Sequence, residues 1–511
     1  RYPKVLRRVG GYNLDAFVPH EQKQGDKETR RQGEVFAPQI SSSPNLLVSL
    51  SDDKQRFNLS NLIVGSEGTL AIIMAAKLRL VARPKFTAIG VAHFDTLDDA
   101  LDAVLPCLAC KPAAVEMMDD ILLDLTRASR DYAKHLASFL QGHPRAVLQV
   151  EFFGDTQDEV IAKLDHLEQY LRAHTRCQAI TRALTAAEKS AILQVRKASM
   201  PLLQSMSPDR KPETFVEDSA VAPERLGEYI RQFRTIVHAH DVQVSFYGHA
   251  SVGLMHARPL INLKDPADVV KMRSIAEQIK DLSIEFGGAL SGEHGDGLAR
   301  SEFNRELFGN TLYEAFREIK RTFDPHSLLN TGKITDAPPM DANLRYGADY
   351  RVTLPLKTHF HFRDSGDMAG AAELCNGNGL CRKTAGGTMC PSYMVTRDEQ
   401  HSTRGRANAL RMVLSGALAP DELTGKRMHE VMDLCIECKG CTGECPSCVN
   451  MTRLKSEWLS QYQAANGIPL RSRLFGNIRL INQIGSALAP LSNWALGLPG
   501  VSRLNERLLG I

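Results

Sequence analysis

A run of closely spaced cysteines near the C-terminal end carries the strongest chemical signal in the sequence. Residues 434–448 read LCIECKGCTGECPSC, in which two residues separate Cys435 from Cys438 and Cys438 from Cys441, and Cys445 precedes a proline. Thiolates at this spacing can wrap three corners of a cubic iron–sulfur cluster, and in two-cluster ferredoxins the fourth cysteine of such a run serves the other cluster. The pattern therefore predicts a [4Fe–4S] cluster, which moves electrons one at a time.

An earlier group of cysteines complements this run. It contains Cys375, Cys381 and Cys390, and Cys390 is followed by a proline just as Cys445 is. By the crossover seen in two-cluster ferredoxins, Cys390 completes the first cluster. A second cluster would use Cys375, Cys381 and Cys445, and it is one ligand short unless Cys448 supplies that ligand. One or two clusters therefore stay open, and structural zinc or ordinary core cysteines are the alternatives.

Two arginines and an isolated cysteine pair bear on the same region and on the cellular compartment. Arg404 and Arg406, in the stretch STRGRA, either lie near the cluster and favour its reduced state or are solvated helix charges. Cys107 and Cys110 form a lone C-x2-C pair in an apolar helical stretch, where we expect core packing rather than metal binding. The clustered cysteines favour metal ligation over disulfides, which implies a reducing compartment.

Two histidine-containing stretches are the second chemical signal. The stretch GHASVGLMH contains His249 and His256, and the stretch SGEHGDG contains Glu293 and His294 between glycines. Two imidazoles and a carboxylate can hold a divalent metal such as zinc with positions left open for a substrate. A further histidine beside them can act as a general base. A hydrolase metal site is the alternative, but hydrolysis produces no electrons for an iron–sulfur cluster.

The segments around these motifs predict an α+β protein. Residues 85–180 alternate helical stretches with β-rich ones, and the same rhythm continues to about residue 335. Residues 266–288 are expected to form an amphipathic helix that ends at two glycines. The apolar run 61–81 contains a Gly-Ser-Glu-Gly turn and predicts a strand, a tight loop and then a helix or strand. Residues 336–370 contain a proline pair and little periodicity, as expected for a linker, and short helices carry the cysteines after it.

Composition excludes some classes of protein. The chain has 511 residues, of which 43% are hydrophobic and 24% charged, and its net charge of +3 gives no support for nucleic-acid binding. Residues 480–502 carry no charge, but Asn482, Pro490 and Pro499 interrupt them. We therefore expect a packed helical hairpin or a peripheral membrane contact there rather than a spanning helix. The first residue is Arg1 rather than Met, so we expect a fragment whose N-terminal part is missing.

Several stretches together resemble one family. They read GYNLDAF (11–17), LIVGSEGTLAI (62–72), GHASVGLMHARP (248–259), SGEHGDG (291–297) and FDPHSLLNTGK (323–333). Together they resemble the flavin-linked D-2-hydroxy acid dehydrogenases, a branch of the vanillyl-alcohol-oxidase superfamily that contains D-lactate, glycolate and D-2-hydroxyglutarate dehydrogenases. The cysteine region resembles the fused iron–sulfur extension of the long bacterial D-2-hydroxyglutarate dehydrogenases.

The resemblance implies a fold and an order of domains. An α+β protein is expected in which the C-terminal part of a PCMH-type FAD-binding domain precedes an α+β substrate domain and an α-helical ferredoxin-like domain. The expected boundaries are 1–82 for the flavin part, 83–335 for the substrate domain, 336–370 for the linker, 371–460 for the iron–sulfur domain and 461–511 for a helical tail. The half of the flavin domain that binds the pyrophosphate is expected to be missing from this sequence.

The resemblance also implies roles for individual residues. Those along the FAD would be Gly65, Ser66, Glu67, Gly68, Thr69, Asn330 and Lys333. The metal ligands would be His249, His256 and Glu293, with His294 as the base. The cations that hold the substrate carboxylates would be Arg196, Lys211 and Arg258, because a cationic side chain suits a carboxylate. The family's usual GHAGDGNLH reads GHASVGLMH here, so its Asp and Asn are absent, and metal coordination or substrate choice can differ.

The implied activity is FAD-dependent oxidation of a D-2-hydroxy acid. D-2-hydroxyglutarate, oxidised to 2-oxoglutarate, is favoured, and D-lactate or glycolate is the alternative substrate. Electrons would pass from the flavin through the [4Fe–4S] cluster to a quinone or a carrier protein. A non-catalytic electron-transfer subunit is the alternative from a different class. We expect a cytoplasmic protein, and a peripheral contact at the inner membrane face and a homo-oligomer both stay open.

Overall fold

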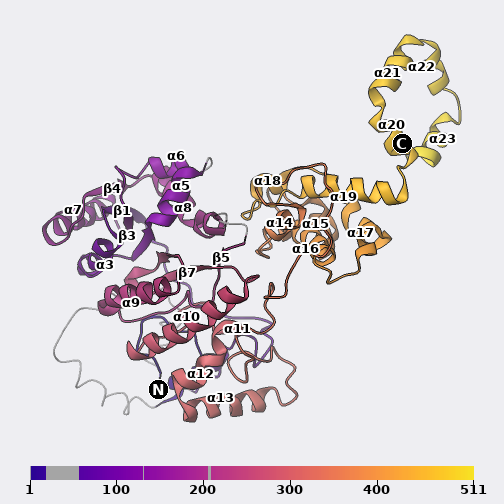
Figure 1. The fold of residues 1–511 in the computed structure, drawn as a ribbon. Helices are drawn as coiled ribbons and strands as arrows, with labels where there is room; N and C mark the ends of the chain where they lie inside the picture. Colours follow the sequence, from indigo (N-terminus) through magenta and orange to yellow (C-terminus); the bar gives the residue numbers. More distant parts are fainter. Residues whose placement is uncertain (1, 19–56, 130–131, 205, 207–208, 511) are drawn as a thin grey trace. The chain divides into compact units, whose positions relative to one another are not determined.

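The chain divides into two compact units, and each is described by itself. The computed structural model describes residues 2–18, 57–129, 132–204, 206 and 209–510 (Figure 1). The first unit ends at Tyr350 and the second begins at Arg351, a division that lies within the expected linker. Part of the predicted flavin segment, residues 19–56, lies outside the described residues.

A mixed set of strands and helices builds the first unit, so the α+β prediction is confirmed. Its strands form a seven-stranded sheet in the order β4-β1-β3-β2-β6-β7-β5, and the pairs between neighbours are antiparallel. The strands are β1 (Phe86–Phe94), β2 (Ala114–Asp119), β3 (Ala146–Gly154), β4 (Ala179–Ala183), β5 (Lys211–Pro212), β6 (Val244–Gly248) and β7 (His256–Ile261).

Helices lie between these strands and after them. The α-helices of the first unit are α2 (Ser60–Ile63), α3 (Leu97–Asp102), α4 (Val104–Ala109), α5 (Asp120–Ala128), α6 (Ala133–Ala137), α7 (Gln157–His174), α8 (Ala186–Gln204), α9 (Leu226–Ala239), α10 (Pro266–Glu285), α11 (Gly297–Arg300), α12 (Asn304–Phe308) and α13 (Asn310–Phe323). Its 3-10 helices are η1 (Leu14–Phe17), η4 (Pro223–Arg225), η5 (Ala250–Val252) and η6 (Ser301–Phe303). The predicted helix at 266–288 is confirmed as α10, which Asp265 caps by accepting a hydrogen bond from Ala267 N.

Strand β1 shows how the sheet is buried on both faces. Ala92 and Phe94 belong to the core on the side of α3 and α7, whereas Ile89 and Val91 belong to the core on the side of α5 and α8. Alternate side chains of a strand point to opposite faces, so a run of apolar residues serves both cores. A Cβ at Gly90 would lie 3.1 Å from leucine side chains of α7, so glycine lets this helix pack closely against the sheet.

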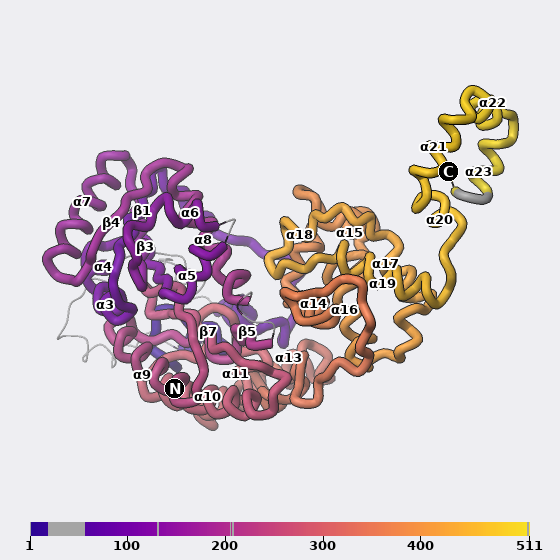
Figure 2. The backbone as a smooth tube through the Cα atoms, turned by 45° about the horizontal axis from the view of Figure 1, so that its top comes forward, coloured from indigo at the N-terminus to yellow at the C-terminus, as the bar shows by residue number. Residues whose placement is uncertain are grey.

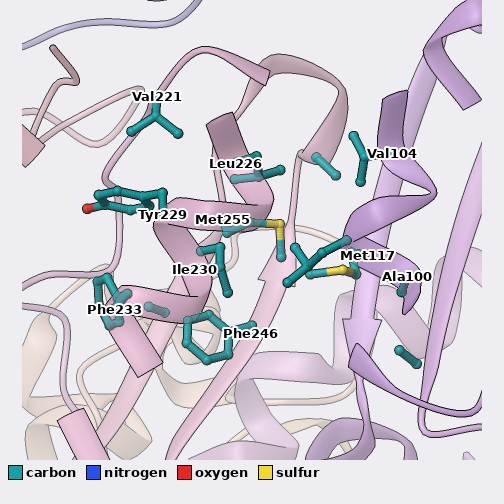
Figure 3. Packing of buried hydrophobic residues seen from close by; sticks show 14 of the residues in the cluster. Ala100, Val104, Met117, Val221, Leu226, Tyr229, Ile230, Phe233, Phe246 and Met255 are labelled. Atoms are coloured by element: carbon teal, nitrogen blue, oxygen red, sulfur yellow. The ribbon is translucent and has the colours of Figure 1, made fainter. Parts of the chain in front are cut away.

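The core under α9 supports the hairpin of β6 and β7. Figure 3 shows side chains of α9, among them Ile230 and Phe233, on the same side as Phe246 of β6. The rings of Phe233 and Phe246 are 5.7 Å apart and meet edge to face. Tyr229 is fully buried, and its hydroxyl lies 2.8 Å from Ser283 Oγ of α10. This apolar base fixes the hairpin that carries two of the predicted metal ligands.

Residues 2–18 and 57–70 pack against α12 and α13 through a small separate core. Tyr12, Leu62, Leu70 and Phe316 are among its buried members, and the rings of Tyr12 and Phe316 are 5.6 Å apart. Tyr12 Oη also lies 2.7 Å from Thr69 Oγ1. The predicted flavin segment is thus attached to the end of the substrate domain.

The strand predicted before the Gly-Ser-Glu-Gly turn is wrong, because this segment forms the short helix α2. Residues 71–85 contain neither helix nor strand, so the prediction of a helix or strand after the turn is also wrong. Their large apolar side chains are exposed, with Met74 and Leu80 each 90% accessible. A strand needs a neighbour to accept its backbone hydrogen bonds, and no described segment pairs with this one. The apolar composition indicated an element, but composition cannot supply the partner.

The second unit is helical throughout its described residues. Its α-helices are α14 (Met368–Glu373), α15 (Pro391–Thr396), α16 (Thr403–Leu414), α17 (Lys426–Asp433), α18 (Gly440–Glu444), α19 (Met451–Asn466), α20 (Leu470–Gly476), α21 (Ile478–Ala487), α22 (Leu491–Leu496) and α23 (Val501–Leu509), and its 3-10 helices are η7 (Leu380–Arg382), η8 (Glu399–His401) and η9 (Pro420–Thr424). Figure 2 shows α16 among α14, α17 and α19, and all three contact it. Four of the predicted cluster ligands belong to the core between them, which confirms the α-helical class of this domain.

Short helices make up the end of the chain. Helices α21 and α22 contact each other, and so do α20 and α23, but α20, α21 and α22 have no buried residue, so the packed hairpin stays a prediction. Among the described residues, no helix is both long and apolar enough to cross a bilayer. Several apolar side chains of this tail are exposed, including Leu491 and Trp494.

Candidate active site and cluster sites

The hairpin of β6 and β7 brings together the two histidines predicted as metal ligands. His249 follows the last residue of β6, and His256 is the first residue of β7. Their rings lie 5.2 Å apart at an angle of 81°. A Cβ at Gly253, whose φ is 72°, would lie only 1.9 Å from the carbonyl oxygen of Val221. Glycine at this position therefore lets the hairpin pack against the segment that precedes α9.

Asp218 shapes the loop that carries the predicted carboxylate ligand and base. It is fully buried, and its Oδ2 accepts hydrogen bonds from Ser291 Oγ at 2.7 Å, from Glu293 N at 3.0 Å and from His294 N at 2.8 Å. Its other oxygen, Oδ1, has no hydrogen-bond partner in the described part of the chain and lies 3.8 Å from His294 Nδ1. A buried carboxylate oxygen left in this state suits a cation.

Three imidazoles converge on one carboxylate oxygen. Glu293 Oε1 lies 3.1 Å from His249 Nε2, 3.4 Å from His256 Nε2 and 3.6 Å from His294 Nε2. Within the described parts of the chain, Asp218, His256, Glu293 and His294 each offer a ligand atom within 4.8 Å of the others. This donor set of imidazole and carboxylate is typical of zinc and similar divalent ions. His249 was predicted as a ligand and adjoins this group, and Asp218 joins it without having been predicted.

Charged neighbours fix the orientation of His249 and Glu293. His249 Nδ1 lies 2.8 Å from Glu116 Oε1, and the same oxygen pairs with Arg196 Nη2 at 2.9 Å. Arg7 Nη1 donates to Glu293 Oε2 at 2.6 Å. Burial lowers the pKa of His249, but hydrogen bonds to Glu116 and Glu293 raise it to about 9. Hydrogen bonds from His249 and His256 hold the pKa of Glu293 well below its usual range.

His294, the predicted base, is held by a second carboxylate. Its Nδ1 lies 3.0 Å from Glu217 Oε1, and Glu217 Oε2 accepts from Arg300 Nη1 at 2.9 Å. The His294 ring stacks on that of His256 with centroids 5.0 Å apart and 8° between their planes. The hydrogen bond to Glu217 raises the pKa of His294, whereas burial lowers that of His256. With Nδ1 engaged, the free nitrogen of His294 is Nε2, on the side of Glu293.

Arg258 is a buried cation beside this group. It lies on β7 two residues after His256, is 5% exposed, and its Nε donates to Tyr247 Oη at 3.3 Å. Its Nη1 is buried without a hydrogen-bond partner among the described residues. The Arg258 charge lowers the pKa of His256, after the larger effect of burial, so the two side chains interact. A buried guanidinium with an unmatched N–H group suits an incoming carboxylate.

The other two predicted substrate cations occupy different settings. Arg196 lies on α8, and its pairing with Glu116 places it 3.4 Å from His249 Nδ1, at the edge of the histidine group. Lys211 lies on β5, which pairs with β7, and its Nζ donates to the carbonyl oxygen of Gln204 at 3.1 Å. Their roles in binding substrate stay predictions.

The predicted flavin loop, residues 65–69, is attached to the histidine site. Both oxygens of Glu67 accept backbone hydrogen bonds from the loop that carries Glu293, with Asp296 N at 2.6 Å and Gly297 N at 2.9 Å. Asn330 Nδ2 donates to Glu67 O at 2.6 Å, and Lys333 is half-buried in the same turn as Asn330.

The conformation of this loop fits a closely approaching ligand. Gly65 and Gly68 have φ values of 78° and 70°, and a Cβ at Gly68 would meet nothing within 4 Å. Ser66 and Thr69 are buried beside them, and Thr69 Oγ1 donates to Ser66 O at 2.7 Å. An open glycine backbone anchored on buried residues lets a flat cofactor approach without a side chain between them. The roles of these residues along FAD stay predictions.

The predicted cluster ligands line two adjoining cavities in the second unit. One cavity is lined by Cys390, Cys435, Cys438 and Cys441. The other is lined by Cys375, Cys381 and Cys445. Met389 and Thr403 line both cavities, and no disulfide joins the 11 cysteines, all of which lie in the described part of the chain. This is the division expected from the crossover of ligands between two runs, and the donor chemistry fits iron–sulfur clusters.

Hydrogen bonds reach the sulfurs from α16. Arg406 is fully buried, and its Nη1 donates to His401 O at 2.7 Å and lies 3.8 Å from Cys390 Sγ. The interpretation of Arg406 as a solvated helix charge is therefore wrong. Arg404 N donates to Cys381 Sγ at 3.4 Å, and its side chain pairs with Glu399. Such hydrogen bonds to sulfur tune the potential of a bound cluster.

Cys107 and Cys110 are core residues, as predicted. Both are buried in the core on the α3 and α7 side of the sheet, and burial raises the pKa of the Cys110 thiol to about 11. A thiol in that state is neutral and unreactive near neutral pH.

The folds and sites of the two units define a flavin-linked oxidase domain followed by an iron–sulfur domain. Residues 83–334 match the family "FAD linked oxidases, C-terminal domain", and residues 374–450 match the family "4Fe-4S dicluster domain". The chain thus carries both of these domains, which supports FAD and an iron–sulfur cluster as its cofactors.

Some curated relatives match most of this chain and others match part of it. The chain is 31% identical to "D-2-hydroxyglutarate dehydrogenase" of Pseudomonas putida and 30% identical to the protein of that name from Escherichia coli K12, over 91% and 90% of its length. It spans about half the length of these relatives, 50% and 49%. A "D-lactate dehydrogenase" of Archaeoglobus fulgidus is 28% identical over 54% of the chain and 58% of its own length.

Sequence reasoning missed the acidic residues that surround the histidines. Glu116, Glu217 and Asp218 come from β2 and from the segment before α9, far in sequence from the histidine motifs. Glu217 and Asp218 stand together in the otherwise apolar stretch FVEDSA, and an adjacent buried acidic pair was the available signal. Glu116 stands alone in a β-strand and carried no signal.

Proposed function

We propose that this chain is the substrate-binding and electron-relay part of an enzyme that oxidises a D-2-hydroxy acid with FAD. The favoured substrate is D-2-hydroxyglutarate, which gives 2-oxoglutarate, and D-lactate or glycolate is the alternative. The observation that carries the proposal is the convergence of three imidazoles on Glu293 Oε1, next to the buried cation Arg258. The names of the relatives, D-2-hydroxyglutarate and D-lactate dehydrogenases, support the substrate class.

The histidine group supplies the acid–base chemistry. His249, His256 and Glu293 would hold a divalent ion such as zinc, with Asp218 Oδ1 close by. Such an ion would polarise the hydroxyl and carboxylate oxygens of a 2-hydroxy acid and lower the pKa of the hydroxyl. His294, whose Nδ1 is engaged by Glu217, would take the hydroxyl proton at Nε2.

The flavin loop explains where the electrons go first. Residues Gly65–Thr69, with Asn330 and Lys333, would lie along FAD, and Glu67 connects this loop to the catalytic one. When bound, FAD accepts the hydride from the α-carbon of the acid and can then release single electrons. The protein residues position the acid and keep the base oriented.

The cations distinguish among substrates. Every 2-hydroxy acid has one carboxylate beside the hydroxyl, and hydroxyglutarate has a second. Arg258, buried with an unmatched N–H group, is the best-placed cation for a carboxylate, and Arg196 and Lys211 are the further candidates. Because lactate and glycolate lack the second carboxylate, a site with an extra buried cation favours hydroxyglutarate.

The cysteine domain would carry the electrons onward. A [4Fe–4S] cluster on Cys390, Cys435, Cys438 and Cys441 would pass them to a quinone or a carrier protein. Cytoplasmic location follows from the reduced state that such thiolates need. The exposed apolar side chains of α21 and α22 favour a peripheral contact at the inner membrane face.

The test measures dye reduction by the intact protein with D-2-hydroxyglutarate, D-lactate and glycolate. We expect turnover with hydroxyglutarate to exceed that with the others, and His294→Ala to lower kcat by about 10²–10⁴-fold because a general base contributes that much. Arg258→Met should raise KM for hydroxyglutarate by about 10-fold or more and leave the monocarboxylic acids less affected.

Two outcomes would contradict the proposal. Unchanged turnover in His294→Ala would remove His294 as the base, and no turnover of any D-2-hydroxy acid by the wild-type protein would favour the non-catalytic electron-transfer subunit. The matched control is His240→Gln, which changes the histidine that follows α9 and that is bonded to Ser274 rather than to this group. We expect this variant to keep wild-type kcat.

A further inference from the structure

The two cysteine cavities differ by one thiolate. Four cysteines line the first cavity, whereas Cys375, Cys381 and Cys445 are the only cysteines that line the second. A complete [4Fe–4S] cluster is held by four cysteine ligands. The match to a dicluster domain implies two clusters, so the second site needs an explanation for its missing corner.

The position of the missing thiolate can be read from the spacing. In the first site, two residues separate Cys435 from Cys438 and Cys438 from Cys441. In the second site, Cys375 and Cys381 are separated by five residues, and Asn378 stands at the middle position that Cys438 occupies in the first. An asparagine thus replaces the central cysteine of an otherwise repeated C-x2-C-x2-C motif.

The structure agrees with this correspondence. Asn378 lines the second cavity together with Cys375 and Cys381, as Cys438 lines the first together with its two neighbours. Asn378 and Cys438 are also both exposed, so each marks the solvent side of its cavity. The Oδ1 of Asn378 accepts a hydrogen bond from Leu380 N at 3.2 Å, which uses the amide to close a turn.

Neither of the nearby alternatives replaces the missing thiolate. Cys448 is exposed, has a φ of 55° and lines neither cavity. Ser447 lines the second cavity but offers a hydroxyl, which is a harder and weaker ligand for iron in a cluster than a thiolate. The alternative left open by the sequence, that Cys448 completes the second cluster, therefore has no support in the cavity lining.

We propose that the second site binds a cluster through three thiolates only, so that the oxidised protein carries a [3Fe–4S] cluster there beside a [4Fe–4S] cluster in the first site. The vacant corner is the one at Asn378. Because Met389 and Thr403 line both cavities, the two clusters would be neighbours in one relay. The inference concerns the cysteine domain and does not depend on which acid is oxidised.

The test measures the type of each cluster and the iron content of the protein. The intact protein is reconstituted anaerobically with iron and sulfide, oxidised mildly with ferricyanide, and examined by EPR and iron analysis. We expect the EPR signal of an oxidised [3Fe–4S] cluster at about one per chain and about seven iron atoms per chain. In Asn378→Cys the signal should disappear and the iron content should rise to about eight.

Matched variants separate the ligand effect from disturbance of the loop. Asn378→Ala, which adds no thiolate, should keep the [3Fe–4S] signal, and so should Cys448→Ser. Cys381→Ser should lose that signal but keep the reduced [4Fe–4S] signal of the first site. If Asn378→Cys fails to fold, Cys448→Ser still decides, since loss of the second cluster in it would make Cys448 the ligand and overturn the proposal.

Three further results would overturn it. The first is about eight iron atoms in the wild-type protein with no [3Fe–4S] signal after oxidation. The second is about four iron atoms, which would mean that the second cavity holds no cluster. The third is an unchanged [3Fe–4S] signal in a folded Asn378→Cys variant.

Discussion

The histidine site and the cysteine sites bring their residues together in opposite ways. The histidine site draws Glu116, Asp218, His256 and Glu293 from separate elements of a large sheet domain. The seven predicted cluster ligands lie in two short stretches, 375–390 and 435–445, and each stretch sets most of its own geometry. The comparison teaches that local spacing predicts a cluster site well, whereas a catalytic site assembled by tertiary packing shows only part of itself in the sequence.

The two regions also differ in how their polar groups are satisfied by the protein. Glu293 is bonded to Arg7 and His249, and His294 to Glu217, so the histidine site is held by its own hydrogen bonds and ion pairs. The cysteine sulfurs accept hydrogen bonds largely from backbone N–H groups, and four of these thiols belong to the core of the second unit. We therefore expect the cysteine domain to depend on its clusters for stability far more than the histidine site depends on its metal.

The largest effect is expected from Cys441→Ser, which removes a predicted ligand of the first cluster. Cys441 is buried and lines the first cavity, so its loss should remove that cluster and most of the stability of the second unit, because cluster binding contributes to folding. Electron transfer to a quinone should fall by about 10²-fold or more, while substrate still bleaches the flavin in a single anaerobic turnover. Stopped-flow absorbance and limited proteolysis measure the two parts.

A wild-type rate of quinone reduction in that variant would show that the relay bypasses the first cluster. Cys107→Ser is the control, because Cys107 is equally buried but lies in the core of the sheet domain. It should change stability without changing the cluster content.

The next largest effect is expected from Glu293→Gln, which changes the predicted carboxylate ligand of the histidine site. The variant removes the charge on which three imidazoles converge, so metal retained after dialysis should fall, with affinity about 10–100-fold weaker. Turnover should drop by about 10²-fold or more, whereas the cluster signals in EPR should stay as in the wild-type protein. Metal analysis beside EPR on one sample checks both statements, and a loss of cluster signal would mean that the two regions are not independent.

The sequence predicted the cysteine sites and the histidine site to different extents, for the same reason. The spacing of the cysteines predicted their division between two cavities, because thiolates with two residues between them in one short loop must point toward the same cluster. The helix at 266–288 and the α+β class followed from periodicity, since apolar positions must face a core whatever the fold. His249, His256, Glu293 and His294 were found because glycine-rich turns and imidazoles are rare enough together to stand out.

The remainder could not be predicted because it depends on distant contacts. Asp218 joins the metal group through hydrogen bonds to a loop 73 to 76 residues away, and no local pattern encodes that pairing. For residues 71–85 the sequence predicted an element that the structure does not contain, because an apolar run forms a strand only where a neighbouring strand is present. Arg406 was ambiguous because a charged helix residue can be exposed or buried, and only its partners decide.

The smallest effect is expected from His93, a buried histidine of the sheet outside the candidate site, which gives a contrast with the site histidines. His93 Nδ1 lies 2.9 Å from Ala179 O, so it donates, and Nε2 accepts from Gln141 N at 3.3 Å, which together fix a neutral ring. Burial lowers its pKa below the ordinary value of 6.5. Stability from this residue is therefore complete above pH 6.5 and is lost as the pH falls through the lower folded-state pKa.

His93→Gln provides the comparison, because glutamine keeps a donor and an acceptor but does not titrate. The wild-type protein should lose more thermal stability than the variant between pH 7.5 and pH 5, while near pH 8 the two should differ little. Tm measured against pH for both proteins checks this. Parallel Tm curves would show that His93 has the same pKa in the folded and unfolded chains. Burial in the sheet would then protect His93 from protonation no better than the half-exposed position of His294 protects that residue.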